Sequence, residues 1–169
     1  MRHIALTALL LVSTAAIAES TCFGTTSKGR IDTAVSLPNS GNNFSAYSTA
    51  GVALGRTYVH SKVAEIVTSA YRELERTTPQ TRFVYGETGW KTGGTFKPHR
   101  THQNGLSVDF FVPVKNSNGN SVPFPGNVTN KFGYDVEFDA NGRYREYSID
   151  FAALGEHLYQ LQIAAARSG

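Results

Sequence analysis

The sequence predicts a single α+β domain in which an antiparallel sheet is flanked by helices. Apolar residues recur every three or four positions over residues 61–77 and again over 151–165, which is the spacing of one helix face. Residues 106–114 instead alternate in the pattern of a half-buried strand. Helices combined with strands that read as antiparallel indicate the α+β class.

Composition narrows the classes of protein to consider. The 169 residues are 40% hydrophobic and 17% charged, with a single cysteine, which excludes a disordered chain and a disulfide-stapled scaffold. The formal net charge is only +3, and no block of Lys and Arg gathers it in one place. We therefore expect no nucleic-acid partner.

The first eighteen residues read as a secretory signal peptide. Arg2 and His3 precede an apolar run over 4–12, and Ala16-Ile17-Ala18 supplies a small-x-small cleavage pattern. The run is too short to remain as a membrane anchor. We expect an exported domain over residues 19–169, in which Cys22 is either a free thiol or one half of a disulfide to another chain.

The elements follow in order from residue 19. Residues 19–57 are rich in Ser, Thr, Gly and Asn, which favours turns, and a helix is then predicted over 61–77, ending before Pro79. A short strand is predicted over 82–85. In the strand predicted over 106–114, Asp109 projects from the face opposite the aliphatic row.

The last third of the chain is expected to contain a hairpin and a helix. Residues 134–138 and 143–147 flank Asn141-Gly142, a pair that tolerates the positive φ angles of a tight turn. Asp150 is a candidate N-cap for the final helix. The apolar stripe expected on that helix comprises Phe151, Leu154, Leu158, Leu161 and Ala165.

Three polar residues between the two central strands, His99, His102 and Asp109, could carry chemistry. Imidazole and carboxylate groups are zinc ligands, and a catalytic zinc takes three protein ligands and leaves one position open. Gly105 permits the tight turn that could bring His102 and Asp109 together. The alternative is that both histidines are exposed loop residues and that Asp109 pairs with a nearby arginine.

The string Thr101-x-His102-x-x-Gly105-x-Ser107-x-Asp109 resembles the signature of the D-alanyl-D-alanine zinc peptidases, and the longer string from His99 to Asp109 is more similar to the penicillin-insensitive murein endopeptidases. The resemblance implies a zinc peptidase of the D-Ala-D-Ala peptidase fold that cleaves peptide cross-links of peptidoglycan in the periplasm. It implies His102 and Asp109 as ligands of Zn²⁺, with His99 as a catalytic residue in the same cleft.

The chain departs from this family at three positions. The family carries a C-terminal His-x-His that supplies the third ligand, whereas these 169 residues contain none. Ser107 replaces a usual carboxylate, and Glu87 stands where the family has Asp. We therefore expect a C-terminally truncated domain that binds zinc weakly and cleaves murein poorly.

The remaining histidines and aromatic residues are open to more than one interpretation. His157 could replace the missing ligand, although its place beside the apolar stripe favours a structural or surface role, and His60 is expected to cap or pack the first helix. Trp90, Phe96 and Tyr85 could form a cleft wall or belong to the core. Two alternative functions stay open, a catalytically silent peptidoglycan-binding domain and a D,D-carboxypeptidase; nothing in the sequence indicates the oligomeric state.

Overall fold

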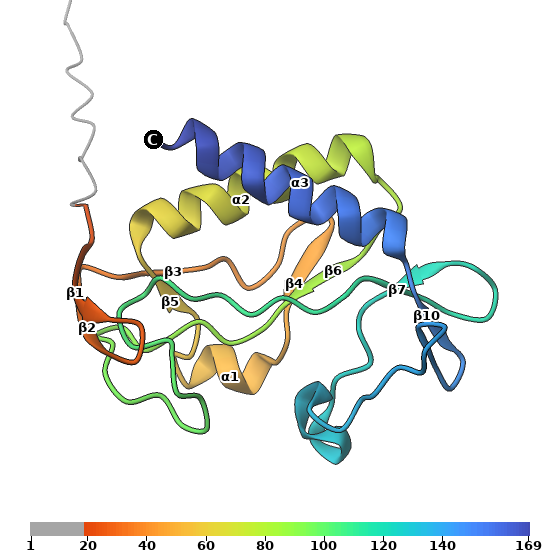
Figure 1. Cartoon of the computed structure of the whole chain (residues 1–169), viewed down its shortest axis with the longest axis horizontal. Coiled ribbons are helices and arrows are strands. Elements are labelled where there is room, and N and C mark those ends of the chain that lie inside the picture. The colour runs from red at the N-terminus through yellow and green to blue at the C-terminus, as the bar shows by residue number, and fades with distance from the viewer. Residues whose placement is uncertain (1–18) are drawn as a thin grey trace, which may run out of the picture.

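A computed structural model describes residues 19–169, and the predicted signal peptide over 1–18 lies outside the described residues. Figure 1 shows two long helices lying side by side over short strands and loops. The helices are α1 (Thr49–Ala53), α2 (Ser61–Thr77) and α3 (Phe151–Arg167), with a short 3₁₀ segment η1 (Val128–Gly133). The strands are β1 (Thr21–Thr25), β2 (Lys28–Asp32), β3 (Val35–Ser36), β4 (Phe44–Ala46), β5 (Tyr58–Val59), β6 (Phe83–Tyr85), β7 (Val114–Lys115), β8 (Ser121–Val122), β9 (Arg143–Tyr144) and β10 (Tyr147–Ile149).

The described strands form four small sheets rather than the single antiparallel sheet expected from the sequence. β1 pairs with β2, β3 pairs with β5, and the order β8-β7-β10-β9 makes a four-stranded sheet, all antiparallel. β4 and β6 are parallel neighbours. The α+β class is confirmed, but the sheet is divided because turns and irregular segments separate most of the strands.

The prediction of one continuous strand over 106–114 is wrong. The backbone of this segment lies beside β6, where Phe111 N–H donates to the Val84 carbonyl at 3.0 Å, but only Phe110 forms a bridge, to Tyr85. The pairing is interrupted by a shift of register at Gly86 and by Pro113, which has no N–H to donate. Only Val114 and the residue after it belong to a named strand, β7.

The hairpin predicted around Asn141-Gly142 is also displaced. Gly142 adopts a φ of 70° in a turn whose amides bond to the Asp139 side chain, so the turn itself is present. Residues 134–138 are not a strand, however, and the strands that pair are β9 and β10, across a turn in which Arg145 has a φ of 53°. The Asp139 carboxylate satisfies the amides that a strand partner would otherwise have bonded.

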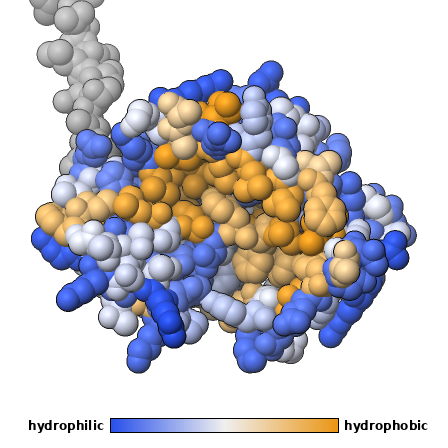
Figure 2. Space-filling view, in the orientation of Figure 1, coloured by the Kyte–Doolittle hydropathy of each residue, from blue (hydrophilic) through white to orange (hydrophobic). Residues whose placement is uncertain are grey.

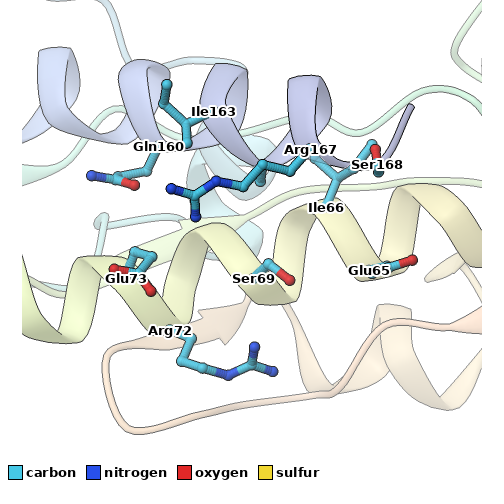
Figure 3. A pocket seen from close by; sticks show the side chains of 10 residues that line it. Glu65, Ile66, Ser69, Arg72, Glu73, Gln160, Ile163, Arg167 and Ser168 are labelled. Carbon is cyan, nitrogen blue, oxygen red and sulfur yellow. The ribbon is translucent and has the colours of Figure 1, made fainter.

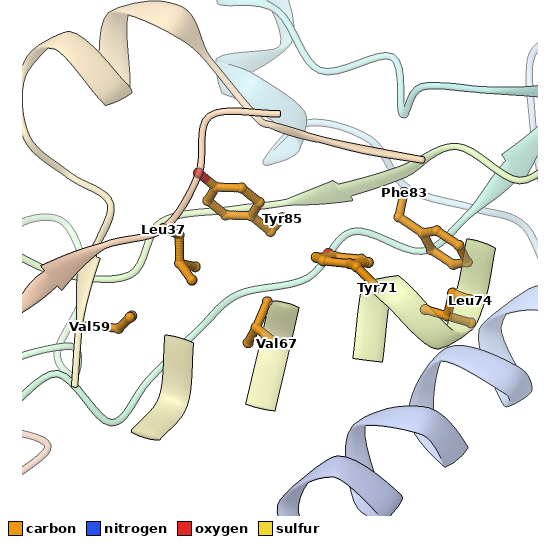
Figure 4. Packing of buried hydrophobic residues seen from close by; sticks show 7 residues of the cluster. All are labelled: Leu37, Val59, Val67, Tyr71, Leu74, Phe83 and Tyr85. Atoms are coloured by element: carbon orange, nitrogen blue, oxygen red, sulfur yellow. The ribbon is translucent and has the colours of Figure 1, made fainter. Parts of the chain in front are cut away.

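The predicted helix over 61–77 is confirmed as α2, which ends ahead of Pro79. His60 is its N-cap, as expected, since Nδ1 accepts a hydrogen bond from Lys62 N–H at 3.1 Å. The core packs beneath this helix (Figure 4), with partly buried Val108 and Phe110 against it. The buried cluster comprises Leu37, Val59, Val67, Tyr71, Leu74, Phe83 and Tyr85.

The final helix, α3, begins at the predicted N-cap Asp150 but turns a different face to the core. Its buried residues are Ala153, His157 and Gln160, whereas Phe151 and Leu158 of the predicted stripe are 64% and 60% exposed. His157 is buried against Tyr71, with ring centroids 5.4 Å apart, and against Phe83. The histidine therefore has a structural role. The stripe prediction holds in part, since Leu161 packs against the core and Leu154 is partly buried, but the buried face is rotated toward Ala153, His157 and Gln160.

The surface near the two long helices is divided between apolar and polar areas. In Figure 2 an apolar area crosses the middle of the face shown, with hydrophilic residues around its border. A groove of about 260 Å³ between α2 and α3 is mostly polar, and Figure 3 shows Arg167 lying between the helices. Among the described residues, no helix combines the length and hydropathy that crossing a membrane requires.

We predict that His157 makes folding sensitive to mild acid. Burial lowers the pKa of His157 to about 4, below the value of about 6.5 in an unfolded chain. Between these values only the unfolded state takes up the proton, so stability falls as the pH falls, by up to about 1.4 kcal/mol per pH unit. Urea unfolding at a series of pH values gives the free energy of unfolding, which should depend less steeply on pH in His157→Leu than in the wild-type protein. The same pH dependence in both proteins would contradict this.

Candidate metal centre

A cleft of about 780 Å³ opens beside the end of β6. One side is built from Gly86, Glu87 and the 98–111 segment, and the other from η1 and the residues that follow it. Several aromatic side chains line it. The residues that line it are Tyr47, Gly86, Glu87, Pro98, His99, Asp109, Phe110, Phe111, Lys131, Phe132, Gly133, Tyr134 and Asp135.

The structure brings His99, His102 and Asp109 together at this cleft. Nε2 of His102 lies 3.2 Å from Oδ1 of Asp109, and Nδ1 of His99 lies 3.7 Å from Oδ2 of the same carboxylate. The three potential ligand atoms all lie within 4.8 Å of one another. The segment between the second histidine and the aspartate therefore turns as the Gly105 spacing suggested.

His102 is held by its backbone and by its second ring nitrogen. The residue is buried and has a φ of 71°, a left-handed conformation that is uncommon for a side chain other than glycine. Its Nδ1 lies 2.9 Å from the Thr88 carbonyl oxygen, which can only accept, so Nδ1 carries the hydrogen and donates it. The lone pair of Nε2 is thus directed toward Asp109, the arrangement typical of metal-binding histidines.

Gly105 makes the turn between the two candidate ligands. Its φ is 78°, and a Cβ at this position would lie 2.4 Å from Cδ1 of Ile31 and 3.0 Å from the backbone nitrogen of His60. Its carbonyl accepts a hydrogen bond from that same His60 N–H at 2.9 Å. Only glycine combines this conformation with this close approach.

Asp109 is placed by a two-against-one pairing with the end of β6. Gly86 N–H donates to the Asp109 carbonyl at 2.7 Å, while Asp109 N–H donates to the Glu87 carbonyl at 3.1 Å. A regular ladder would return the second bond to Gly86, so Gly86 and Glu87 together oppose one residue, as in a β-bulge. A Cβ on Gly86 would lie 2.8 Å from Cβ of Asp109, which explains the glycine.

Glu87 forms the polar centre behind the histidines. Its carboxylate accepts hydrogen bonds from the Tyr47 hydroxyl at 2.6 Å and from Arg56, whose Nη2 lies 3.0 Å from Oε2. Nε2 of His99 lies 2.5 Å from Oε2. Burial alone would raise the pKa of the Glu87 carboxyl, but these hydrogen bonds hold it below its ordinary value, so the group is ionised.

The donor set at Asp109 fits a divalent metal ion. Burial would lower the pKa of His102, but the hydrogen bond and the negative charge of Asp109 raise it. Zinc bonds of about 2.0–2.2 Å place tetrahedral ligands roughly 3.3–3.5 Å apart. The separation of 3.2 Å between Nε2 of His102 and Oδ1 of Asp109 is close to that spacing.

A model of the penicillin-insensitive murein endopeptidases matches residues 22–125, well over half of the chain. The chain belongs to this family. It is therefore related to peptidases that act on murein, the cross-linked peptidoglycan of the cell wall. No curated protein sequence matches it significantly. The match includes all three residues of the candidate metal centre and β1–β8, whereas β9, β10 and α3 lie beyond it.

The other residues that the sequence offered as a metal ligand or as a cleft wall do not line the cleft of this murein endopeptidase family member. His157 and His60 belong to the core and the α2 cap, and Tyr85 and Phe96 are buried. Trp90 packs edge-on against Phe96 with centroids 5.1 Å apart and is not among the residues that line the cleft. The aromatic cleft wall is instead formed by Tyr47, Phe110, Phe111, Phe132 and Tyr134.

Sequence reasoning missed the residues that surround His99. Glu87 stands out in the sequence only as a departure from the family, although a charged residue two positions after the buried strand Phe83–Tyr85 could have indicated its role. Tyr47, Arg56 and Tyr134 gave no local signal, since they come from segments far apart in the chain. The Tyr134 hydroxyl, from the opposite side of the cleft, lies 2.9 Å from Nε2 of His99.

We predict that Arg56→Ala destabilises the fold by about 3 kcal/mol, because it leaves the Glu87 carboxylate buried without its cation. The Arg56 and Glu87 side chains are only 14% and 13% exposed. The matched control is Arg76→Ala, which breaks a pair with Glu73 whose side chains are 75% and 36% exposed; it should cost at most about 1 kcal/mol. Denaturant unfolding measures the loss in free energy of unfolding for each variant, and equal losses in Arg56→Ala and Arg76→Ala would contradict the prediction.

Proposed function

We propose that this protein is a zinc-dependent endopeptidase that cleaves D-amino-acid-containing peptide cross-links of peptidoglycan. We assign its fold to the zinc D-Ala-D-Ala peptidase type, with His102 and Asp109 as metal ligands and His99 as a catalytic residue. The observation that carries the proposal is the 3.2 Å approach of the His102 Nε2 lone pair to the Asp109 carboxylate. Family membership supplies the murein substrate class.

The convergence of these groups supports a cation between them. An imidazole lone pair and a carboxylate oxygen repel each other unless a proton or a metal ion lies between them. His102 has its other nitrogen committed to Thr88, so its ring cannot turn away without losing a buried hydrogen bond. Zinc bound at such a site acts as a Lewis acid that polarises a carbonyl oxygen and lowers the pKa of a water molecule.

His99 is placed to move a proton beside the metal ligands. Its ring is mostly buried, lies 4.6 Å from the His102 ring between centroids, and lines the cleft. Nδ1 faces the Asp109 carboxylate at the cleft, where it can take up and return a proton during amide hydrolysis. The apolar rings of Phe111, on the same side of the cleft, and of Phe132, on the opposite side, can pack against the peptide stems of the substrate.

The proposed site of action is the periplasm. Murein lies outside the cytoplasmic membrane, and the signal peptide predicted over residues 1–18 would export the domain to it. The partner is then peptidoglycan itself.

We predict about one weakly bound zinc per chain for residues 19–169, because His102 and Asp109 supply two protein ligands where a catalytic zinc usually has three. His102→Ala and Asp109→Ala should each weaken binding at least tenfold, because each removes one of the few protein ligands. The matched controls are His157→Leu and Asp32→Ala, which remove a buried histidine and an exposed aspartate away from the cleft. Metal analysis after dialysis without chelator measures this; zinc that persists in both ligand variants would contradict the assignment.

Digestion of cross-linked murein tests the activity. We expect cross-linked dimers to be converted slowly to monomers, and a chelator to stop the conversion. Release of terminal D-Ala with dimers left intact would indicate a D,D-carboxypeptidase instead. Sedimentation with sacculi without any released product would indicate a peptidoglycan-binding domain and would contradict the endopeptidase proposal.

A further inference from the structure

The Glu87 carboxylate has every oxygen position committed to a neighbour. Oε1 accepts from Tyr47 and Arg56, and Oε2 accepts from Arg56 and faces His99. These partners come from three separate segments of the chain that converge on one largely buried group. Because the carboxylate cannot rotate without breaking several charge-assisted hydrogen bonds, it is a rigid acceptor.

Arg56 is itself fixed in place. Its Nη2 also donates to the Lys97 carbonyl at 2.9 Å, and its guanidinium carbon lies 4.1 Å from the centroid of the Phe96 ring. Phe96 is fully buried. The position of Oε2 is therefore determined by the core and not by solvent.

This fixed acceptor determines which nitrogen of His99 carries the hydrogen. An ionised carboxylate only accepts, so the 2.5 Å contact places the hydrogen on Nε2. The Tyr134 hydroxyl, 2.9 Å from the same nitrogen, is then a second acceptor for this N–H. The lone pair of a neutral His99 ring is then on Nδ1, which faces Asp109. In His102 the Thr88 carbonyl makes the opposite selection, with the hydrogen on Nδ1 and the lone pair on Nε2.

We propose that Glu87 is a positioning residue that holds His99 as its Nε2–H tautomer, so that adjacent residues Glu87 and Thr88 impose opposite tautomers on the two histidines. Both lone pairs then converge on the Asp109 carboxylate. The assignment of a catalytic role to His99 rests on the proposed function, but the tautomer follows from the contacts alone. Glu87 acts through His99 and needs no contact with the substrate.

Nitrogen-15 NMR of the imidazole rings tests the tautomers directly. In the zinc-loaded protein we expect His99 to be protonated at Nε2 and His102 at Nδ1. A His99 ring that carries a hydrogen on Nδ1, alone or together with Nε2, would overturn the proposal. If the protein binds no zinc, the proposed function fails, and the metal-free protein at about pH 9, well above the usual histidine pKa of about 6.5, still reports the His99 tautomer.

A Glu87→Gln variant tests the consequence for catalysis. Gln can either accept or donate at this position, so it permits both tautomers of His99. We expect a mixed tautomer signal for His99, an unchanged His102, zinc bound at the wild-type ratio, and a kcat lowered about 10–100-fold with little change in KM. The matched control is Glu73→Gln, at the exposed pair with Arg76, which should leave all of these readouts unchanged.

The outcomes separate positioning from simple structural support. A kcat within about twofold of wild type in folded Glu87→Gln, or a loss of activity that only follows the folded fraction, would overturn the positioning role. If Glu87→Gln does not fold, the tautomer of His99 measured in the wild-type protein decides whether the proposal holds. Wild-type protein that binds zinc but leaves murein intact would contradict the proposed function. The tautomer of His99 would still be tested, because its NMR measurement does not depend on activity.

Discussion

The candidate metal centre depends on one irregular backbone pairing, in which Gly86 and Glu87 together oppose Asp109. The bulge shifts the register where β6 ends, so that the charged residue after the buried strand lies next to the 98–109 segment. A regular ladder would keep successive side chains alternating across the sheet. The same backbone that positions the Asp109 carboxylate thus delivers the Glu87 acceptor and the Thr88 carbonyl to the two histidines.

The hydrophobic core gives this arrangement its rigidity and accounts for what could be predicted of the fold. Val108 and Phe110 pack against the core cluster while Asp109 between them faces the cleft, so the alternation read from the sequence holds over these three residues. Leu106 at the start of the row is exposed, and the continuous strand does not form. The α2 helix and its His60 cap were predictable because local periodicity and a Pro stop encode them. The buried face of α3 was not, because the packing of His157 on Tyr71 and Phe83 depends on residues far away in sequence.

The site could be predicted only in part, for the same physical reason. His102, Gly105 and Asp109 lie within eight consecutive residues, so their spacing and the freedom of Gly105 already indicated a turn that joins them. The environment of His99 could not be predicted, because its partner Glu87 is itself held by Arg56, which lies 31 positions away in the chain. Long-range hydrogen bonds of this kind decide the tautomer of a histidine, while sequence spacing shows only that the histidine is present.

The central claim is that a metal ion belongs at the point where His102 and Asp109 converge. A crystal of residues 19–169 grown with zinc and measured on both sides of the zinc absorption edge locates the ion without reference to activity. We predict one strong anomalous peak within bonding distance, about 2.0–2.2 Å, of Nε2 of His102 and a carboxylate oxygen of Asp109. An occupied zinc position elsewhere, with none beside these two atoms, would contradict it.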